Sequence, residues 1–124
     1  MSNKILVVDD EESLRMLFQA EFEETGYQVK TAATAEEALA IIPDYQPNLV
    51  IMDIRMPGMS GLEALAKIKE MERDLPVIIC SAYGEYKQDF SSWASDGYVI
   101  KSTNLDELKR QVKKFLPLPV TPEN

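Results

Sequence analysis

The sequence of 124 residues has no histidine, one cysteine and no long run of apolar residues. Without histidine, the chain has no imidazole for metal binding or for acid–base chemistry. The lone Cys80 cannot form an internal disulfide, which favours a reducing cytoplasm, and its apolar neighbours predict a buried thiol. No stretch approaches the roughly 20 apolar residues of a transmembrane helix, and the N-terminus shows no secretory signal. We therefore expect no association with a membrane.

Positive charge is also scarce, since 13 lysines and arginines face 21 aspartates and glutamates and the formal net charge is −8. This balance argues against direct binding to nucleic acid, because cationic side chains are needed to neutralise phosphates. A hydrophobic content of 45% and a charged content of 27% are ordinary for one globular domain of this length. We expect a single domain over residues 1–124, with its core at about 4–116 and a frayed tail at 117–124.

Strand signals alternate with helical spacing five times along the chain. Short apolar runs that end abruptly at a polar residue are typical of strands buried on both faces of a parallel sheet. Five such βα units predict an α/β fold, a doubly wound parallel sheet with helices on both faces. The expected strands are 4–8, 28–31, 48–52, 76–80 and 98–100.

The helices between these strands are predicted from apolar spacing and from their end signals. The first should bury one face and end at Gly26; that face comprises Leu14, Leu17, Phe18 and Phe22. Capping boxes at 34–37 and 60–63 should open the second and third helices. We expect Pro43 to end the second helix after Ile42. The apolar side of the third should comprise Leu62, Leu65, Ala66 and Ile68.

The last two helices differ in how strongly the sequence predicts them. A fourth helix at 85–95 has suitable apolar spacing but contains three serines, which are indifferent helix formers. The fifth should begin near Asn104 and end before Pro117. Its apolar positions are Leu105, Leu108, Val112 and Phe115.

Three aspartates follow directly after two of the apolar runs, Asp9 and Asp10 after the first and Asp53 after the third. In open α/β sheets the ligand lies beyond the carboxyl ends of the strands, so these acids should meet in one crevice. Helix N-capping would account for one acid after each strand, but not for an adjacent pair plus a third. Such a group of carboxylates favours a hard cation such as Mg²⁺.

Ser81 and Lys101 follow the fourth and fifth runs and should reach the same crevice. A carboxylate nucleophile, a divalent cation, a hydroxyl donor and an ammonium group together suit phosphoryl transfer. The cation and the ammonium group offset charge on the phosphoryl oxygens, and the hydroxyl donates a hydrogen bond to one of them.

With these residues in place, the chain closely resembles the receiver domain of two-component response regulators. The resemblance covers residues 4 to about 116 and implies a flavodoxin-like (βα)5 fold with strand order 2-1-3-4-5. The stretch from Asp53 to Gly61 is its most specific part. The motifs that carry it are 5–11, 50–61, 81–84 and 98–101.

The resemblance also implies a role for each residue of the crevice. Asp53 is similar to the phosphoacceptor, which takes its phosphoryl group from a phosphohistidine. Asp10 resembles a direct Mg²⁺ ligand, together with Asp53 and the backbone carbonyl of Arg55, whereas Asp9 resembles an acid that holds the metal through water. Lys101 matches the residue that pairs first with the acceptor and then with the phosphoryl group.

Two further positions match the residues by which the family responds to phosphorylation. Ser81 stands where a hydroxyl reaches the phosphoryl oxygen, and Tyr98 stands at the aromatic switch position. The sequence departs from the family where Ser102 follows Lys101 in place of a proline, which puts the conformation of that peptide bond in question. Ser81 and Lys101 are also only 20 positions apart, a couple fewer than usual, and the deficit falls in 85–95.

The resemblance implies a protein that catalyses only its own phosphorylation and dephosphorylation and acts through protein contacts. Its expected partners are a sensor histidine kinase or histidine phosphotransferase and a downstream protein target. The eight residues after Leu116 are too few for an output domain. One alternative is a receiver fragment of a longer DNA-binding regulator. Another is a Mg²⁺-dependent phosphatase of the haloacid-dehalogenase type, although its Asp-x-Asp motif is absent because Glu11 follows Asp9 and Asp10.

Overall fold

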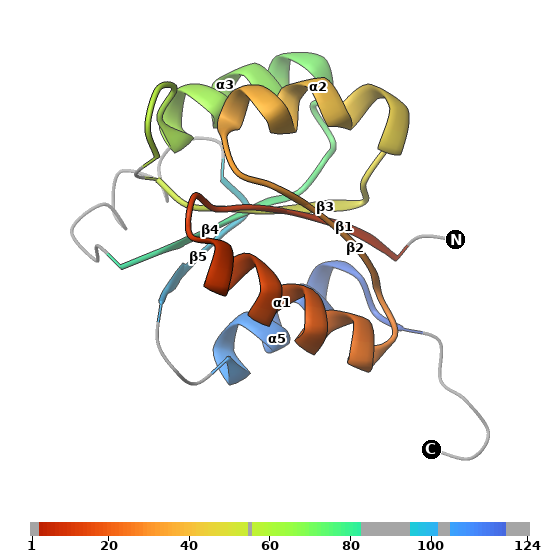
Figure 1. Ribbon diagram of the computed structural model, residues 1–124. Helices are drawn as coiled ribbons and strands as arrows, with labels where there is room; N and C mark the ends of the chain where they lie inside the picture. Colours follow the sequence, from red (N-terminus) through yellow and green to blue (C-terminus); the bar gives the residue numbers. More distant parts are fainter. Residues whose placement is uncertain (1–2, 55, 83–94, 102–104, 119–124) are drawn as a thin grey trace.

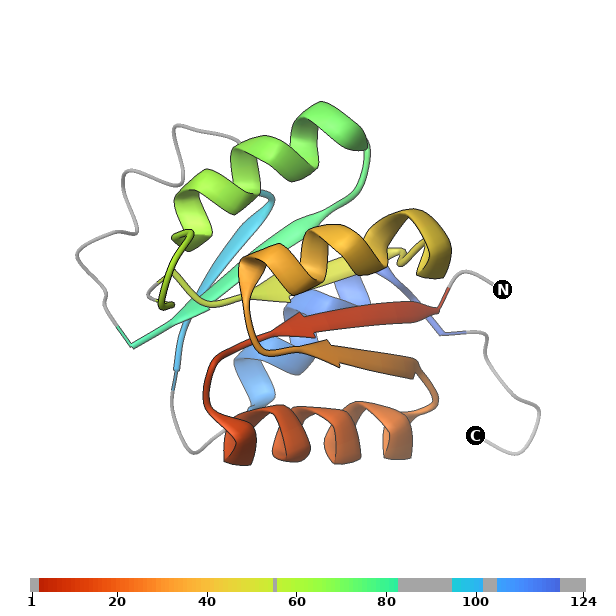
Figure 2. The ribbon, with the colours of Figure 1, turned by 45° about the horizontal axis from the view of Figure 1, so that its top comes forward.

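The computed structural model describes residues 3–54, 56–82, 95–101 and 105–118. Within them, a parallel sheet has the strand order β2-β1-β3-β4-β5, so the predicted fold class and order are confirmed. The arrowheads of β1 and β2 point the same way in Figure 2. The strands are β1 Lys4–Val8, β2 Gln28–Ala32, β3 Leu49–Met52, β4 Val77–Ser81 and β5 Gly97–Ile100.

The helices among the described residues lie on both faces of the sheet (Figure 1). Helices α2 and α3 lie on one face, and α1 and α5 lie on the other. Their bounds are α1 Glu12–Thr25, α2 Ala35–Tyr45, α3 Gly61–Met71 and α5 Asp106–Phe115. The fourth helix expected at 85–95 and the bond between Lys101 and Ser102 lie outside the described residues. None of the described helices is long and apolar enough to span a membrane.

Each strand supplies side chains to two separate cores because successive side chains point to opposite faces. In β1, Leu6 and Val8 pack towards α2 and α3, whereas Ile5 and Val7 pack towards α1 and α5. Strands β3 and β4 are buried along their whole length. Burial on both faces is the reason why these segments appear in the sequence as continuous apolar runs.

Two predicted core positions are wrong. Leu17 is 40% exposed, because α1 buries Phe18 and Phe22, which are four residues apart, and Leu17 lies about 100° away around the helix. Ala66 is exposed as well, and Ala64 packs against the sheet in its place. Spacing alone identified an apolar stripe in each helix but not the side of that stripe that meets the sheet.

Pro43 does not end the second helix, which continues to Tyr45. Pro43 lacks a backbone donor, yet its φ of about −65° is compatible with a helix, and α2 continues for two residues beyond it. Ile42 anchors the turn in the core while Pro43 is exposed. The helix closes at Gln46, whose φ is 52° and whose N–H donates to the Ile42 carbonyl at 2.9 Å.

The helix ends predicted at Gly26 and Ser60 are confirmed, whereas the capping box predicted at 34–37 is only half formed. Gly26 ends α1 with a φ of 121°. Ser60 and Glu63 form the reciprocal capping box at the start of α3. At α2, Thr34 caps the Glu37 N–H, but the Glu37 carboxylate accepts from Ala33 rather than from Thr34.

Candidate functional site

The predicted site residues meet because their strands pair in register at one edge of the sheet. Val8 of β1 lies opposite Met52 of β3, so Asp9 and Asp53 follow a matched pair. The Asp53 N–H donates to the Val8 carbonyl at 3.1 Å, and the Lys101 N–H donates to the Ser81 carbonyl at 2.7 Å. These bonds fix the backbone of four strands just before the crevice.

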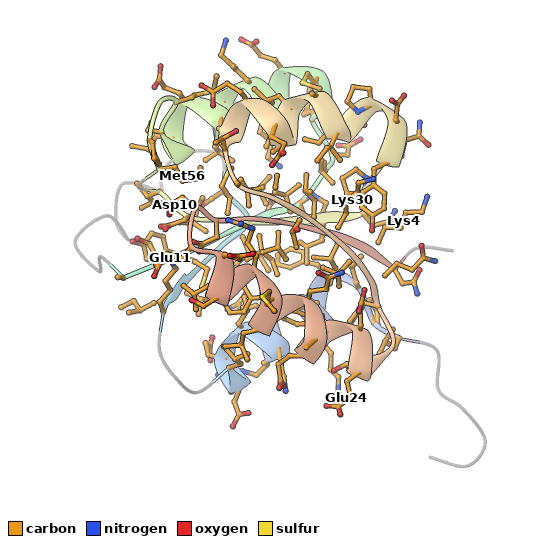
Figure 3. All side chains as sticks on the ribbon, viewed as in Figure 1. Lys4, Asp10, Glu11, Glu24, Lys30 and Met56 are labelled. Atoms are coloured by element: carbon orange, nitrogen blue, oxygen red, sulfur yellow. The ribbon has the colours of Figure 1, made fainter. Side chains whose placement is uncertain are left out.

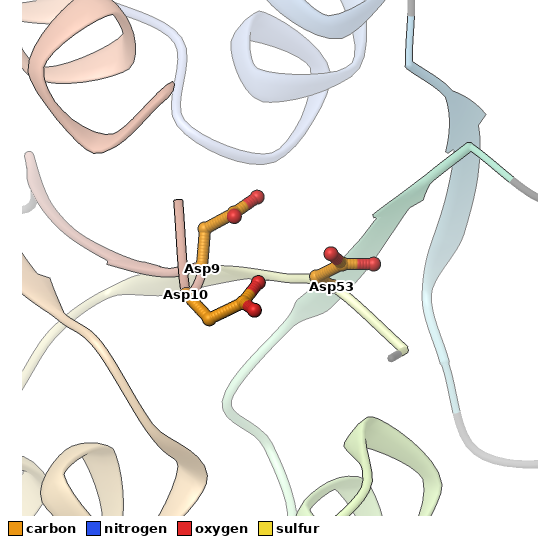
Figure 4. A group of neighbouring side chains, drawn as sticks. All are labelled: Asp9, Asp10 and Asp53. Atoms are coloured by element: carbon orange, nitrogen blue, oxygen red, sulfur yellow. The ribbon is translucent and has the colours of Figure 1, made fainter. Parts of the chain in front are cut away.

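Asp9, Asp10 and Asp53 form an acidic cluster. One carboxylate oxygen from each lies within 4.8 Å of the other two. Asp9 and Asp10 project from the end of β1, and Asp53 projects from the end of β3 (Figure 4). Asp9 and Asp53 are only 2% and 6% exposed, whereas Asp10 is exposed. Carboxylate oxygens are the ligands that Mg²⁺ prefers, so this cluster has the donor set of a hard-cation site.

Lys101 is the cation of this crevice. Its Nζ lies 2.8 Å from Asp9 Oδ2 and 2.9 Å from Asp53 Oδ2, and 3.6 Å from Glu11 Oε1. Burial by itself would lower the pKa of Lys101, but hydrogen bonds and charges from Asp9 and Asp53 outweigh burial and raise that pKa above its usual range. Lys101 therefore stays charged, and one ammonium group still leaves the carboxylates in excess.

The two acids of the Asp9–Asp10 pair have different surroundings. Asp9 Oδ1 accepts from the Glu11 N–H at 2.9 Å while Oδ2 pairs with Lys101, so both oxygens of Asp9 are engaged. Asp10, in contrast, is exposed and lies beside Glu11 (Figure 3). Of the pair, Asp10 is the carboxylate that is open to a ligand from solvent.

The other predicted residues differ in burial, and one of them is not described by the structure. Ser81 is fully buried as the last residue of β4, and Tyr98 is partly buried in β5 against the core beneath α3. Arg55, whose carbonyl was predicted as a metal ligand, lies outside the described residues. Cys80 is buried as predicted, and burial raises the pKa of its thiol to about 12, so it is not a reactive thiolate.

Two residues that the sequence did not single out also contact the backbone of the site. Arg15 of α1 donates from Nη1 to the Asp9 carbonyl at 2.7 Å. Glu36 of α2 accepts from the Met59 N–H at 3.2 Å and so ties the loop after β3 to α2. Arg15 is part of no motif, and Glu36 lies within the capping-box stretch 34–37 without being one of its two capping residues. The signal at Arg15 was weak: a basic residue near a helix N-terminus, where the helix dipole disfavours positive charge.

Comparisons with known proteins agree with this geometry. The family model of the response regulator receiver domain matches residues 5–113. Sporulation initiation phosphotransferase F of Bacillus subtilis is 38% identical over 120 residues, which are 95% of this chain and 97% of that protein. Several further curated relatives are longer, and the chain spans 26% to 51% of their length.

Solved structures show the same similarity. Response regulator protein TrrA of Thermotoga maritima, in complex with Mg(2+)-BeF, is 49% identical with a TM-score of 0.87, covering 92% of this chain and 99% of that one. A second structure of TrrA, in complex with histidine kinase ThkA, gives a TM-score of 0.85 at 49% identity, with 92% and 98% covered. These findings do not favour a phosphatase of the haloacid-dehalogenase type. With its sheet order, its acidic cluster and a family match over nearly all of its length, the chain belongs to the response regulator receiver domain family.

Proposed function

We propose that this receiver domain accepts a phosphoryl group on Asp53 from the phosphohistidine of a partner protein. The observation that carries the proposal is the buried Asp53 carboxylate at the end of β3, 2.9 Å from Lys101 Nζ and beside Asp9 and Asp10. An Asp53 oxygen attacks phosphorus, the P–N bond to imidazole breaks, and the leaving nitrogen keeps the electron pair and takes up a proton. The product is an aspartyl phosphate.

The cofactor of this reaction is Mg²⁺, supported by the acidic cluster and by the related TrrA structure in complex with Mg(2+)-BeF. Asp10, Asp53 and the carbonyl of Arg55 would hold it directly, and Asp9 would hold it through water. The engagement of both Asp9 oxygens by Lys101 and Glu11 supports this division of roles. When bound, Mg²⁺ offsets negative charge on the phosphoryl oxygens.

Lys101 and Ser81 stabilise the transferred group. Lys101 pairs with Asp53 before transfer, and its long side chain then follows the added negative charge to a phosphoryl oxygen. The Ser81 hydroxyl, at the end of β4, donates to a second oxygen. Tyr98 lies on the adjacent strand β5, where it pairs with Ile79 of β4, and we assign it the role of the aromatic switch.

The proposal extends to the whole chain and to its setting. Residues 1–124 form one receiver domain in the cytoplasm that catalyses only its own phosphorylation and dephosphorylation. Its upstream partner is a sensor histidine kinase or histidine phosphotransferase, supported by the TrrA complex with histidine kinase ThkA and by the similarity to a sporulation phosphotransferase. It signals through a downstream protein target and contacts neither nucleic acid nor a membrane directly.

Phosphorylation of Asp53 is testable with a small acyl-phosphate donor and Mg²⁺. We expect the protein to gain one base-labile phosphate by intact mass, and Asp53→Ala to gain none, because the attacking oxygen is lost. Asp44→Ala removes an exposed carboxylate at the end of α2 and is the matched control, which should label like the unchanged protein. Phosphate retained by Asp53→Ala would move the acceptor to another residue.

Mg²⁺ binding should depend more on Asp10 than on Asp9. Asp10→Asn removes a direct ligand, whereas Asp9→Asn removes an acid that already pairs with Lys101 and acts through water. We expect Asp10→Asn to raise the Kd for Mg²⁺ at least about 10-fold more than Asp9→Asn, measured by calorimetric titration. Equal losses, or a larger loss in Asp9→Asn, would contradict the division of roles between the two acids.

A further inference from the structure

Arg15 joins the first helix to the end of the first strand. It lies near the start of α1, where its backbone N–H donates to the Glu11 carbonyl at 3.1 Å. Its side chain, which is half-buried, turns back towards the sheet, and Nη1 donates to the backbone carbonyl of Asp9 at 2.7 Å. A hydrogen bond from a charged donor at this distance is among the stronger kinds.

The carbonyl that accepts this hydrogen bond belongs to Asp9, the first residue after the end of β1. The Asp9 N–H still donates to Ala32 of β2, and the Val8 carbonyl still accepts from Asp53 beyond β3, both at 3.1 Å. The next carbonyl along the chain is that of Asp9, and it accepts from Arg15 in place of a strand. The peptide between Asp9 and Asp10 is thus fixed by a side chain from α1.

The Asp10 carboxylate branches from the residue that follows this peptide. The Asp10 side chain is exposed, so core packing does not define its direction as it does for Asp9 and Asp53. What defines it is the backbone from which it branches. Groups in the outer shell that orient a metal ligand are commonly worth 10–100-fold in metal affinity.

Arg15 acts on a carbonyl and leaves the carboxylate oxygens of the crevice to other partners. Among the described residues, Arg15 forms no ion pair, whereas Arg110 pairs with Glu107 in its own helix. The helix dipole and the entropy of a long side chain both oppose placing an ordered arginine near the start of α1. The hydrogen bond to the Asp9 carbonyl offsets these costs, and it engages none of the carboxylate oxygens that would bind the metal.

We infer that Arg15 is a positioning residue for the metal site, which orients Asp10 through the Asp9 carbonyl. The inference rests on the proposed function. For the loss of Arg15, it predicts a change in the affinity for Mg²⁺ opposite to the change that charge alone would cause. Removal of a positive charge beside an acidic cluster should strengthen cation binding, whereas loss of a positioning bond should weaken it.

The test is a calorimetric titration of the full chain with MgCl₂. We expect Arg15→Gln to raise the Kd for Mg²⁺ by about 10-fold or more. Arg73→Gln is the matched control, because it makes the same charge change at an exposed arginine after α3 and should leave the Kd within about two-fold. Arg15→Lys keeps the charge but lacks the guanidinium, and we expect it to weaken binding as well.

The outcomes separate the inference from the function on which it rests. An Arg15→Gln protein that binds Mg²⁺ as tightly as Arg73→Gln, or more tightly, overturns the role of Arg15. Failure of the unchanged protein to bind Mg²⁺ at millimolar concentration counts against the proposed function instead. Thermal unfolding without Mg²⁺ identifies a variant that has lost its fold. If Arg15→Gln is such a variant, the Kd of Arg15→Lys for Mg²⁺ is compared with that of Arg73→Gln instead.

Discussion

Lys101→Met is expected to tighten Mg²⁺ binding and at the same time to slow phosphorylation of Asp53. Lys101 Nζ lies within 3 Å of an oxygen of both Asp9 and Asp53, so it repels a second cation in the crevice. Its removal should lower the Kd for Mg²⁺ by at least about 10-fold, since unit charges a few ångströms apart interact by several kcal/mol near a protein surface. Transfer should slow by about 100-fold or more, the usual effect of losing one donor to the transferred group.

The same change should destabilise the metal-free protein. Asp9 and Asp53 are nearly buried, and without Lys101 they lose their shared cation. Removing one partner of a buried ion pair typically costs about 3–5 kcal/mol, and we expect about 3 kcal/mol here because Lys101 is partly exposed. Addition of Mg²⁺ should recover much of this loss.

The pH dependence of stability provides a second check on Lys101. Its pKa is higher in the folded protein than in the unfolded chain, so the folded state binds the proton more tightly. The resulting stabilisation is complete at neutral pH and is lost as the pH rises above the ordinary range of lysine. Lys101→Met should therefore lack this part of the alkaline decline, as followed by urea unfolding at several pH values.

Lys109→Met is the matched control for these measurements. Lys109 also pairs with a carboxylate, Glu21 at 2.6 Å, but this pair joins α5 to α1 at the surface, away from the crevice. Its loss should have little effect on stability, because solvent screens an exposed pair, and should leave both the Kd for Mg²⁺ and the labelling rate unchanged. If Lys101→Met behaves like Lys109→Met in the titration, Lys101 does not compete with the metal.

Gly61→Ala should destabilise the fold by about 3 kcal/mol or more, although it places a better helix former at the start of α3. A Cβ on Gly61 would lie 2.2 Å from the Asp53 carbonyl oxygen and 2.8 Å from Ile54 Cα. Both neighbours are backbone atoms at the end of β3, and the Gly61 N–H already donates to the Ile54 carbonyl at 2.7 Å. Relief of the clash requires α3 or the acceptor strand to move.

Urea unfolding of Gly61→Ala and Gly97→Ala measures this effect directly. A Cβ on Gly97 would meet the end of the flexible Gln111 side chain at 3.1 Å, which is able to turn away. We expect a change within about 1 kcal/mol for Gly97→Ala, partly offset by the lower entropy of its unfolded chain. Gly61→Ala should also slow labelling of Asp53, because the clash falls on the acceptor's own backbone. A neutral or stabilising Gly61→Ala would show that helix propensity outweighs the close approach.

Residue patterns alone were enough to predict the architecture of the fold and the composition of the site. Apolar runs of strand length, each ending at a polar residue, predicted the strands and their parallel packing, because such runs occur where a strand is buried on both faces. Acids directly after the first and third runs then had to meet at the carboxyl edge of the sheet. The motif around Asp53 added the family, which the comparisons confirmed.

The partners of each side chain, in contrast, could be identified only in the folded chain. Asp53 and Lys101 are 48 positions apart in the sequence. Their 2.9 Å contact depends on the sheet order, which places the ends of β3, β4 and β5 next to one another. The exposure of Leu17 and the extension of α2 past Pro43 depend on how each helix packs, and a local sequence pattern carries no information about that packing. The bond from Arg15 to the Asp9 carbonyl has no sequence signature either, since any backbone carbonyl accepts from any arginine that packing brings near. Patterns of residue type specify elements and their ends, whereas contacts between elements depend on distances that arise only when the chain is folded.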